Sequence, residues 1–277
     1  MNLRNDPVPS LTALLSAAAR GAHYLVDGPD ALLDDADARA LCGLFDPSPL
    51  TFQLAHPDVP VLAAARSSAV IRARFATAVL AAHEVSQIVV LGAGLDSSIR
   101  ASAGRQCWLV DRSEVLRWRS ELFNRASIDN GGWLVPAELA TADLMAVLVE
   151  AGLDPDCPTA VVALGLTMYL SASDVEAVVT QLAGLPAGSV LVADALLPDA
   201  AADQAGRAYA AAITAQAGGR EPWRWRPTSS ELHAVLAEGG WRAEIVPEAE
   251  AVPSRFWERQ RHLRPHGLVQ LVRASRR

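Results

Sequence analysis

The stretch QIVVLGAGLDSS, residues 87–98, and the stretch CWLVD, residues 107–111, decide the fold of this chain. Residues 88–91 form a short β-branched run, which is typical of a buried parallel strand. The run ends on Gly92 and Gly94, where the absence of a Cβ lets a ligand approach the backbone. The second strand ends on Asp111, whose carboxylate can accept both hydroxyls of a ribose. This order predicts a nucleotide-binding turn, followed by a helix whose N-terminus offers N–H groups to the ligand.

The nucleotide is identified largely by what the chain lacks. A dinucleotide fingerprint has glycine or alanine in its third position, where this chain has Ser97, and this disfavours NAD and FAD. All 24 cationic side chains are arginine, because the sequence contains no lysine. A P-loop ATPase, a pyridoxal phosphate Schiff base and a Tyr-Lys dehydrogenase all need lysine. S-adenosylmethionine needs glycine backbone and a ribose acid but no lysine, so the pattern favours it.

Five motifs along the chain resemble those of the leucine carboxyl methyltransferase family, in the same order. They are LGAGLDSS at 91–98, VD at 110–111, VPAEL at 135–139, LGLTMYLS at 164–171 and VQLVRASRR at 269–277. The bacterial branch that includes polyketide O-methyltransferases is the closer likeness. The resemblance runs from about Arg72 to the C-terminus. It implies a class I methyltransferase fold with S-adenosylmethionine as cofactor.

The resemblance also implies which residues bind the cofactor. Gly92 and Gly94 would approach the methionine part, and Asp111 would hold the ribose. Glu138 would accept the exocyclic amine of the adenine, and the backbone N–H of Leu139 would meet a ring nitrogen.

An arginine is expected to bind the methionine carboxylate of the cofactor. The resemblance matches Arg72, in the sequence RARF, to this role. The interval from Arg72 to Gly92 is shorter than the family pattern, so Arg74 and Arg66 stay open as alternatives.

Tyr169 matches a tyrosine at the floor of the family's substrate pocket, which makes it the candidate catalytic and substrate-binding residue. A pocket aromatic with no chemical task is the alternative. Two positions depart from the family pattern: Leu164 stands where a glutamate would face the cofactor, and Ser98 stands where an arginine is expected. These departures keep a second hypothesis open, in which the fold catalyses cyclisation or rearrangement without transferring a methyl group.

The rest of the chain alternates between strand and helix patterns. Strands are predicted at 87–92, 107–111, 132–135, 159–164 and 189–194, and two more follow in WRAEIV and GLVQLVRAS. Helices are predicted at 10–20, 31–41, 61–82, 96–103, 113–125, 140–151, 172–184, 200–217 and 228–239. The alternation predicts one Rossmann-like α/β domain over 1–277, with a doubly wound seven-stranded sheet and an antiparallel last strand. Residues 1–84 are expected to form a helical cap, and 85–199 with 228–277 the core.

Residues 200–227 interrupt the core as an insertion that ends in GGREPWRWRP. Insertions of this length are usually functional or disordered, and tryptophan disfavours disorder. We expect a lid in which Trp223, Arg224 and Trp225 bind a planar or anionic substrate. The alternative is that the tryptophans only attach the insertion to the core.

Composition excludes several classes of protein. The net charge of −7 and the pI near 5.4 argue against nucleic acid as a partner. The N-terminus lacks the apolar segment of a signal peptide, and no apolar run is long enough to span a membrane. Three cysteines without C-x-x-C spacing indicate neither a disulfide framework nor a zinc site, so we expect a cytoplasmic protein without a metal. A monomer and a homodimer both stay open.

The candidate bases are few. Asp194, at the end of the fifth strand, is either a base or a structural acid. His262 and His266 are separated by Pro265, which prevents the helix that would align them as ligands. A carboxylate acceptor is already ionised at neutral pH and needs no base, whereas a phenol does. We therefore expect an O-methyltransferase that acts on a carboxylate or an acidic hydroxyl of a small natural product, and a non-catalytic binding protein is a third hypothesis.

Overall fold

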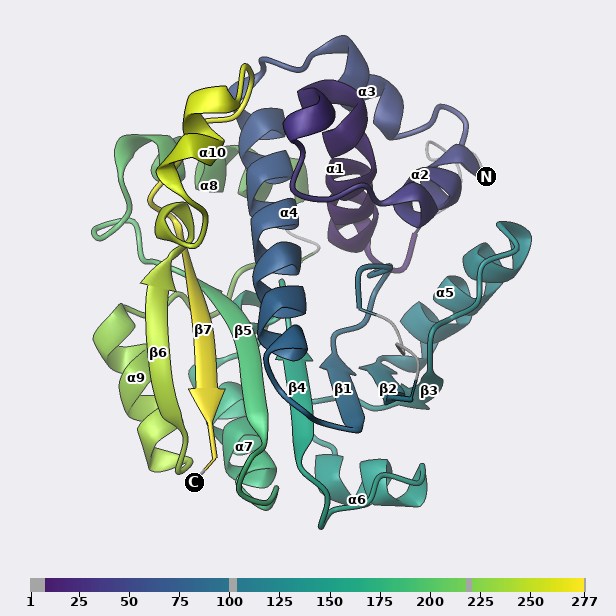
Figure 1. Ribbon diagram of the computed structural model, residues 1–277, viewed down its shortest axis with the longest axis vertical. Coiled ribbons are helices and arrows are strands. Elements are labelled where there is room, and N and C mark those ends of the chain that lie inside the picture. The colour runs from purple at the N-terminus through teal and green to yellow at the C-terminus, as the bar shows by residue number, and fades with distance from the viewer. Residues whose placement is uncertain (1–7, 100–103, 218–220, 277) are drawn as a thin grey trace.

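Seven strands form one sheet within the part of the chain that the computed structural model describes, residues 8–99, 104–217 and 221–276. The order across the sheet is β3-β2-β1-β4-β5-β7-β6. The strands are β1 (Gln87–Leu91), β2 (Gln106–Asp111), β3 (Trp133–Pro136), β4 (Thr159–Ala163), β5 (Val190–Leu196), β6 (Arg242–Pro247) and β7 (Val269–Ser275). β7 is antiparallel to both of its neighbours, while β1 to β5 pair in parallel. The predicted Rossmann-like α/β fold with an antiparallel last strand is confirmed (Figure 1).

Helices cover both faces of this sheet (Figure 1). They are α1 (Leu11–Asp27), α2 (Ala36–Gly43), α3 (Leu50–Ala55), α4 (Pro60–Ala81), α5 (Ser113–Arg125), α6 (Leu144–Glu150), α7 (Ala172–Leu182), α8 (Gln204–Ala217), α9 (Ser229–Glu238) and α10 (Ser254–Arg259). Three short 3-10 helices accompany them: η1 (Gly28–Asp30), η2 (Thr167–Tyr169) and η3 (Glu248–Glu250). In Figure 1, α4 runs down the front of the sheet and α7 and α9 lie behind it.

The alternation of side chains along β1 explains why the strand is uniformly apolar. Ile88 and Val90 pack with α4 on one face, while Val89 and Leu91 pack with α6, α7 and α9 on the other. A central strand that is covered on both faces has no position for a polar side chain. The order of the strands reverses direction between β1 and β4, and α1 to α3 gather over the carboxyl ends of these strands (Figure 1). Open α/β sheets bind ligands at this point.

The helical cap begins as predicted but differs in its boundaries. Ser10 caps α1, and its Oγ accepts the N–H of Ala13 at 3.2 Å. α1 continues to Asp27, well beyond the predicted end at residue 20, and stops at Gly28, which has a φ of 77°. The acidic helix predicted at 31–41 begins only at residue 36, because the Asp35 side chain caps α2 by accepting the N–H of Ala38 at 2.9 Å.

One predicted helix is wrong over the residues that the structure describes. Residues 96–99 are not helical, and residues 100–103, the rest of the prediction, lie outside the described residues. The carboxylate of Asp96 accepts both the N–H and the Oγ–H of Ser98 at 2.6 Å. Arg119 donates to the carbonyl oxygens of Gly94 and Asp96 at 3.0 and 2.8 Å. The hydrogen bond from Arg119 occupies the carbonyl oxygen of Asp96, which a helix that begins there would pair within itself. Residues 96–99 therefore do not begin a helix.

The described residues include neither a candidate membrane span nor a candidate metal site. None of the helices there combines the length and the apolar character that crossing a membrane requires. No group of three or more His, Cys, Asp or Glu side chains there is arranged to hold a metal ion.

Candidate functional site

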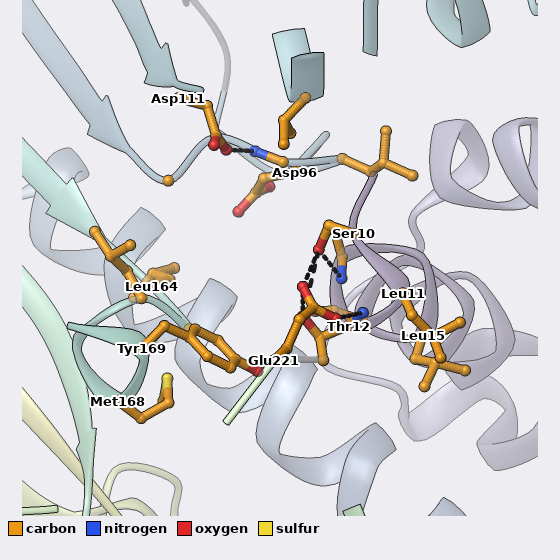
Figure 2. Close-up of a pocket in the computed structure, with 18 of the residues that line it drawn as sticks. Ser10, Leu11, Thr12, Leu15, Asp96, Asp111, Leu164, Met168, Tyr169 and Glu221 are labelled. Atoms are coloured by element: carbon orange, nitrogen blue, oxygen red, sulfur yellow. Dashed lines mark hydrogen bonds between the residues drawn. The ribbon is translucent and has the colours of Figure 1, made fainter. Parts of the chain in front are cut away.

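A cavity of about 540 Å³ lies at the carboxyl ends of β1, β2 and β4, under α1 and beside α4 (Figure 2). It is lined by nine of the ten site residues that the sequence predicts. These are Arg72, Gly92, Gly94, Asp111, Glu138, Leu139, Tyr169, Trp223 and Arg224. Segments that are far apart in the sequence therefore meet around one space, and the tenth residue, Trp225, lies elsewhere.

The glycine turn after β1 is built as the sequence suggests. Gly92 and Gly94 have φ values of 66° and 44°, in the left-handed region that side chains disfavour. The N–H of Gly94 donates to Oδ2 of Asp111 at 2.8 Å, and the N–H of Arg112 donates to Oδ1 at 2.8 Å. Burial raises the pKa of Asp111 and outweighs these two hydrogen bonds, which act to lower it. The carboxylate is thus fixed at the cavity wall directly beside the turn.

Arg72 is the one of the three candidate arginines that lines the cavity. Its Nη2 donates to Oγ of Ser16 at 2.8 Å, and its Nη1 lies 3.7 Å from Oδ2 of Asp194. The guanidinium covers Gly165, where a Cβ would stand 3.3 Å from Cζ of Arg72.

The two other arginines lie away from this space. Arg66 is fully buried and donates to Asp27, Gln53 and the carbonyl oxygen of Pro57, while Arg74 is exposed on the same helix. Neither lines the cavity, so the structure favours Arg72.

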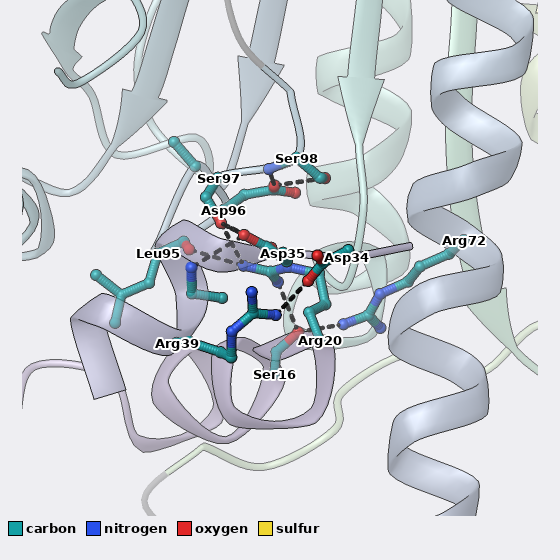
Figure 3. A network of polar contacts seen from close by, with 12 residues as sticks. Ser16, Arg20, Asp34, Asp35, Arg39, Arg72, Leu95, Asp96, Ser97 and Ser98 are labelled. Atoms are coloured by element: carbon teal, nitrogen blue, oxygen red, sulfur yellow. Dashed lines mark hydrogen bonds and ion pairs between the residues drawn. The ribbon is translucent and has the colours of Figure 1, made fainter. Parts of the chain in front are cut away.

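Two arginines that sequence reasoning missed hold the glycine turn in place. Arg20, in α1, donates through Nη2 to the carbonyl oxygen of Leu95 at 2.8 Å and through Nε to Asp35 at 2.9 Å (Figure 3). Ser97 donates to the same Asp35 carboxylate at 2.8 Å. Arg119 binds the turn from α5, on the other side. Ser98 stands where the family pattern has an arginine, and here guanidinium groups from two helices bind the turn instead.

The departure at Leu164 leaves an apolar side chain in the cavity wall (Figure 2). Asp96, which lines the same cavity, supplies negative charge nearby. Burial acts to raise its pKa, but Arg20 and the hydrogen bonds from Ser98 outweigh burial and hold the pKa of Asp96 below its usual value. The cavity therefore contains an ionised carboxylate although the expected glutamate is absent.

Tyr169 lies on η2, and the side chains of Thr12 and Trp223 act to lower the pKa of its hydroxyl. Burial raises the pKa of Tyr169. The phenol is therefore protonated at neutral pH, and it can donate a hydrogen bond but cannot act as a base. The backbone N–H of Arg224 donates to the carbonyl oxygen of Met168 at 2.7 Å, which attaches the insertion beside Tyr169.

Glu221 joins the insertion to the start of α1 (Figure 2). Its Oε1 accepts the hydroxyls of Ser10 and Thr12 at 2.8 and 3.1 Å, and its Oε2 accepts the N–H of Thr12 at 3.0 Å. Ser10 and Glu221 are 211 residues apart in the sequence. Sequence reasoning missed this contact because an acid beside a helix start is visible only in three dimensions.

The remaining candidates have other surroundings. Trp225 packs against the core beneath α7 and α9, and this does not support its predicted contact with substrate. Arg224 has a half-exposed side chain that pairs with Asp174 at 3.3 Å. Asp194 is fully buried, accepts the N–H of Gly165, and has its pKa raised by burial. His262 pairs with Asp58 at 2.6 Å, and it is not brought to His266.

Comparisons with known proteins concern the family and the fold of this chain. The family model for leucine carboxyl methyltransferase matches residues 13–183. A provisionally named S-adenosyl-L-methionine-dependent methyltransferase from Mycobacterium sp. (strain JLS) is 25% identical over 266 residues, which covers 92% of this chain and 83% of the relative. A protein with a similar name from Parafrankia sp. (strain EAN1pec) is 34% identical over 188 residues, which covers 64% of this chain and 59% of the relative.

Two crystal structures share the fold. A provisionally named methyltransferase from Thermobifida fusca matches with a TM-score of 0.60 and 19% identity, over 98% of this chain and 96% of its own. A DUF574 family protein from Streptomyces avermitilis matches with a TM-score of 0.56 and 18% identity, over 94% of this chain and 97% of its own. At these identities the comparison concerns the fold alone.

Proposed function

The chain belongs to the leucine carboxyl methyltransferase family, and from this premise we propose that it methylates an oxygen atom of a small natural product. It is a methyltransferase, and its cofactor is S-adenosylmethionine. The observation that carries the proposal is the cavity, in which Asp111 stands beside the glycine turn and a tyrosine faces them from the opposite wall. Acceptor oxygens of two classes, carboxylate and hydroxyl, are consistent with this function.

The residues around the turn fit the cofactor. Each carboxylate oxygen of Asp111 accepts one of the backbone hydrogen bonds described above. A carboxylate oxygen can accept more than one hydrogen bond, so the two oxygens can also accept the two hydroxyls of a ribose. Gly94 allows α1 to approach the turn closely, since a Cβ there would stand 3.2 Å from Cβ of Ala13. In this proposal Arg72 binds the methionine carboxylate, Glu138 and Leu139 bind the adenine, and Asp96 compensates for Leu164.

When bound, S-adenosylmethionine supplies an electrophilic methyl group on a sulfonium. The chain contributes by aligning the acceptor oxygen with that methyl group and by excluding water. Tyr169 donates a hydrogen bond that positions the acceptor. We propose that residues 200–227 act as a lid, because Trp223 lines the cavity and Glu221 closes onto α1.

The experiment that tests the function uses S-adenosylmethionine labelled in its methyl group and an extract of the producing organism as the source of acceptors. We expect label in one small molecule together with release of S-adenosylhomocysteine. Turnover of that molecule without label and without S-adenosylhomocysteine would support the non-methylating alternative, which the comparisons do not favour. No binding of S-adenosylhomocysteine at all would leave only a cofactor-independent role.

The lid is tested separately. Trp223→Ala is expected to weaken binding or turnover of the acceptor and to leave the affinity for S-adenosylhomocysteine nearly unchanged. Trp225→Ala is the matched control, because Trp225 packs against the core instead of lining the cavity. Loss of thermal stability and cofactor affinity together in Trp223→Ala would instead mean that this tryptophan only attaches the insertion.

A further inference from the structure

A second group of buried polar side chains stands in the cavity wall that α4 and α8 form. Ser68 and Tyr209 line the cavity from these two helices. The Oγ of Ser68 donates to Oε2 of Glu248 at 2.9 Å and lies 3.1 Å from Nε2 of His266. The rings of Tyr209 and His266 pack with their centroids 5.2 Å apart. The exposed fractions of Ser68, Glu248 and His266 are only 3%, 3% and 6%.

Glu248 is unusual among these residues because part of its carboxyl group has no protein partner. Its Oε1 is buried and accepts no hydrogen bond from the described residues. Burying a carboxyl oxygen without a partner is costly, and an apolar residue would fill the same space without that cost. Packing alone therefore does not account for an acid here, and each unsatisfied buried group needs an explanation of its own.

The charges that act on Glu248 come from two elements, α4 and β5. The pKa of Glu248 is raised to about 8. Burial and the charge of Asp194 raise it, while the hydrogen bond from Ser68 and the charge of Arg72 act to lower it. Burial lowers the pKa of His266, against the effect of Asp203, so the imidazole is neutral at neutral pH. Burial also keeps the phenol of Tyr209 protonated.

These charges disfavour a negatively charged acceptor group at Ser68. Arg72 is the cation that acts on Glu248, and it already forms an ion pair with Asp194. A carboxylate bound at Ser68 would also meet Glu248, a like charge whenever Glu248 is ionised. A neutral hydroxyl would instead donate a hydrogen bond to Oγ of Ser68.

Part of the wall of the cavity that Ser68 lines is apolar and aromatic. Six of its side chains belong to one apolar cluster that includes residues of α4: Met168, Tyr169, Leu196, Tyr209, Trp223 and Val269. Aromatic walls of this kind pack well against a planar ring. The wall therefore suits a hydroxyl carried on a ring or a conjugated system better than one on a polar chain.

We propose that Ser68, with Glu248 and His266 behind it, binds the acceptor hydroxyl and receives its proton, so that the acceptor is a phenol or enol instead of a carboxylate. This inference rests on the proposed function. The acceptor hydroxyl donates to Oγ of Ser68, and its proton passes through Ser68 to the carboxylate of Glu248. The oxygen then forms a bond to the methyl carbon, the bond from that carbon to sulfur breaks, and the electron pair stays on sulfur as S-adenosylhomocysteine forms. Ser68 touches the acceptor, and Glu248 acts through it.

The test measures binding of 2-naphthol and 2-naphthoate to the protein saturated with S-adenosylhomocysteine. We expect the wild-type protein to prefer 2-naphthol, and Ser68→Ala to weaken that binding about tenfold, the value of one good hydrogen bond. Ser67→Ala is the matched control, because Ser67 is a buried neighbour on α4 whose Oγ donates only to the carbonyl oxygen of Ala64. The control is expected to bind 2-naphthol as the wild type does.

A pH profile separates proton acceptance from a merely structural role. In the wild type, affinity for 2-naphthol should increase as the pH rises through about 8, where Glu248 loses its proton. In Glu248→Gln this dependence should disappear.

Equal or tighter binding of 2-naphthoate, binding of neither probe, or an unchanged pH profile in Glu248→Gln would overturn the inference. If the variants fail to fold, the preference and the pH profile of the wild type still decide it. Failure of the wild type to bind S-adenosylhomocysteine would refute the proposed function instead.

Discussion

The ion pair between Arg20 and Asp35 provides a sharp test of how the cap supports the glycine turn. Both side chains are 5% exposed, and Nε and Oδ2 are 2.9 Å apart. In Asp35→Ala the buried Arg20 guanidinium loses the carboxylate to which it is hydrogen-bonded, although the charge of Asp96 still acts on it. Losing a hydrogen bond between charged groups costs about 1.5–3 kcal/mol. The same change removes the cap of α2, which adds about 1 kcal/mol. We expect a loss of about 2.5–4 kcal/mol in the free energy of unfolding.

The neighbouring residue gives the control. Asp34 pairs with Arg39, but the side chains of this pair are 24% and 50% exposed. Exposed pairs contribute about 0–1 kcal/mol, so Asp34→Ala should leave stability nearly unchanged. Urea unfolding followed by circular dichroism measures both variants, and equal m-values would show that the comparison is valid.

The size of the loss decides whether the pair is buried in solution. A loss below about 1 kcal/mol in Asp35→Ala would mean that water reaches Arg20, and the reasoning would be refuted. Replacing both partners by apolar residues, Arg20→Met with Asp35→Leu, should recover little of the loss, because the buried carboxylate of Asp96 then loses the charge of Arg20. Weaker binding of S-adenosylhomocysteine by Asp35→Ala is also expected, since Arg20 and Asp35 hold Leu95 and Ser97 of the turn.

Three further predictions concern the cavity. Asp111→Ala should weaken binding of S-adenosylhomocysteine about tenfold to a hundredfold, or about 1–3 kcal/mol, because two ribose hydroxyls lose a charged acceptor. Titration calorimetry that gives an unchanged Kd would remove Asp111 from the site. Leu164→Glu should preserve or tighten cofactor binding if the methionine ammonium lies there, and calorimetry on the same ligand measures this. A stability loss of several kcal/mol with no gain in affinity would mean an unpaired buried carboxylate. Asp96, whose folded pKa is lowered, contributes stability that is present above its unfolded pKa of about 3.8 and is lost as the pH falls through the folded value. The difference in unfolding free energy between wild type and Asp96→Asn should therefore shrink below about pH 4, and a difference that is constant down to pH 2 would contradict the ion pairing.

The sheet was predictable because a strand that is buried on both faces has an uninterrupted apolar sequence. Residues 88–91 and 159–163 are uninterrupted apolar or small runs, and each became a buried central strand. Glycine and acid at the ends of successive strands then located the turn and Asp111, because parallel strands bring their carboxyl ends together. The fold class and the candidate residues at the glycine turn therefore depend on local patterns that a single sequence contains.

The parts that were not predictable depend on contacts between distant segments. Arg20 lies on a helix that resembles no motif, and only the folded chain brings its side chain to the carbonyl oxygen of Leu95. Ser68, Glu248 and His266 are separated by up to 198 residues, so no spacing rule connects them. The helix predicted from residue 96 failed for a related reason, since Arg119 binds the carbonyl oxygen of Asp96, which the helix would have needed.

The hydrogen bonds between Glu221 and the start of α1 make it possible to follow opening of the insertion at one backbone group. The amide hydrogen of Thr12 is bound by the carboxylate of Glu221, so it exchanges with solvent only when these two segments separate. If ligands enter and leave at this edge, the opening rate sets an upper limit on how often a methylated product can escape, and the exchange rate of this backbone hydrogen equals the opening rate when reclosing is slower than exchange. The residence time of the product and the amide exchange of Thr12 then both measure how often the insertion separates from α1.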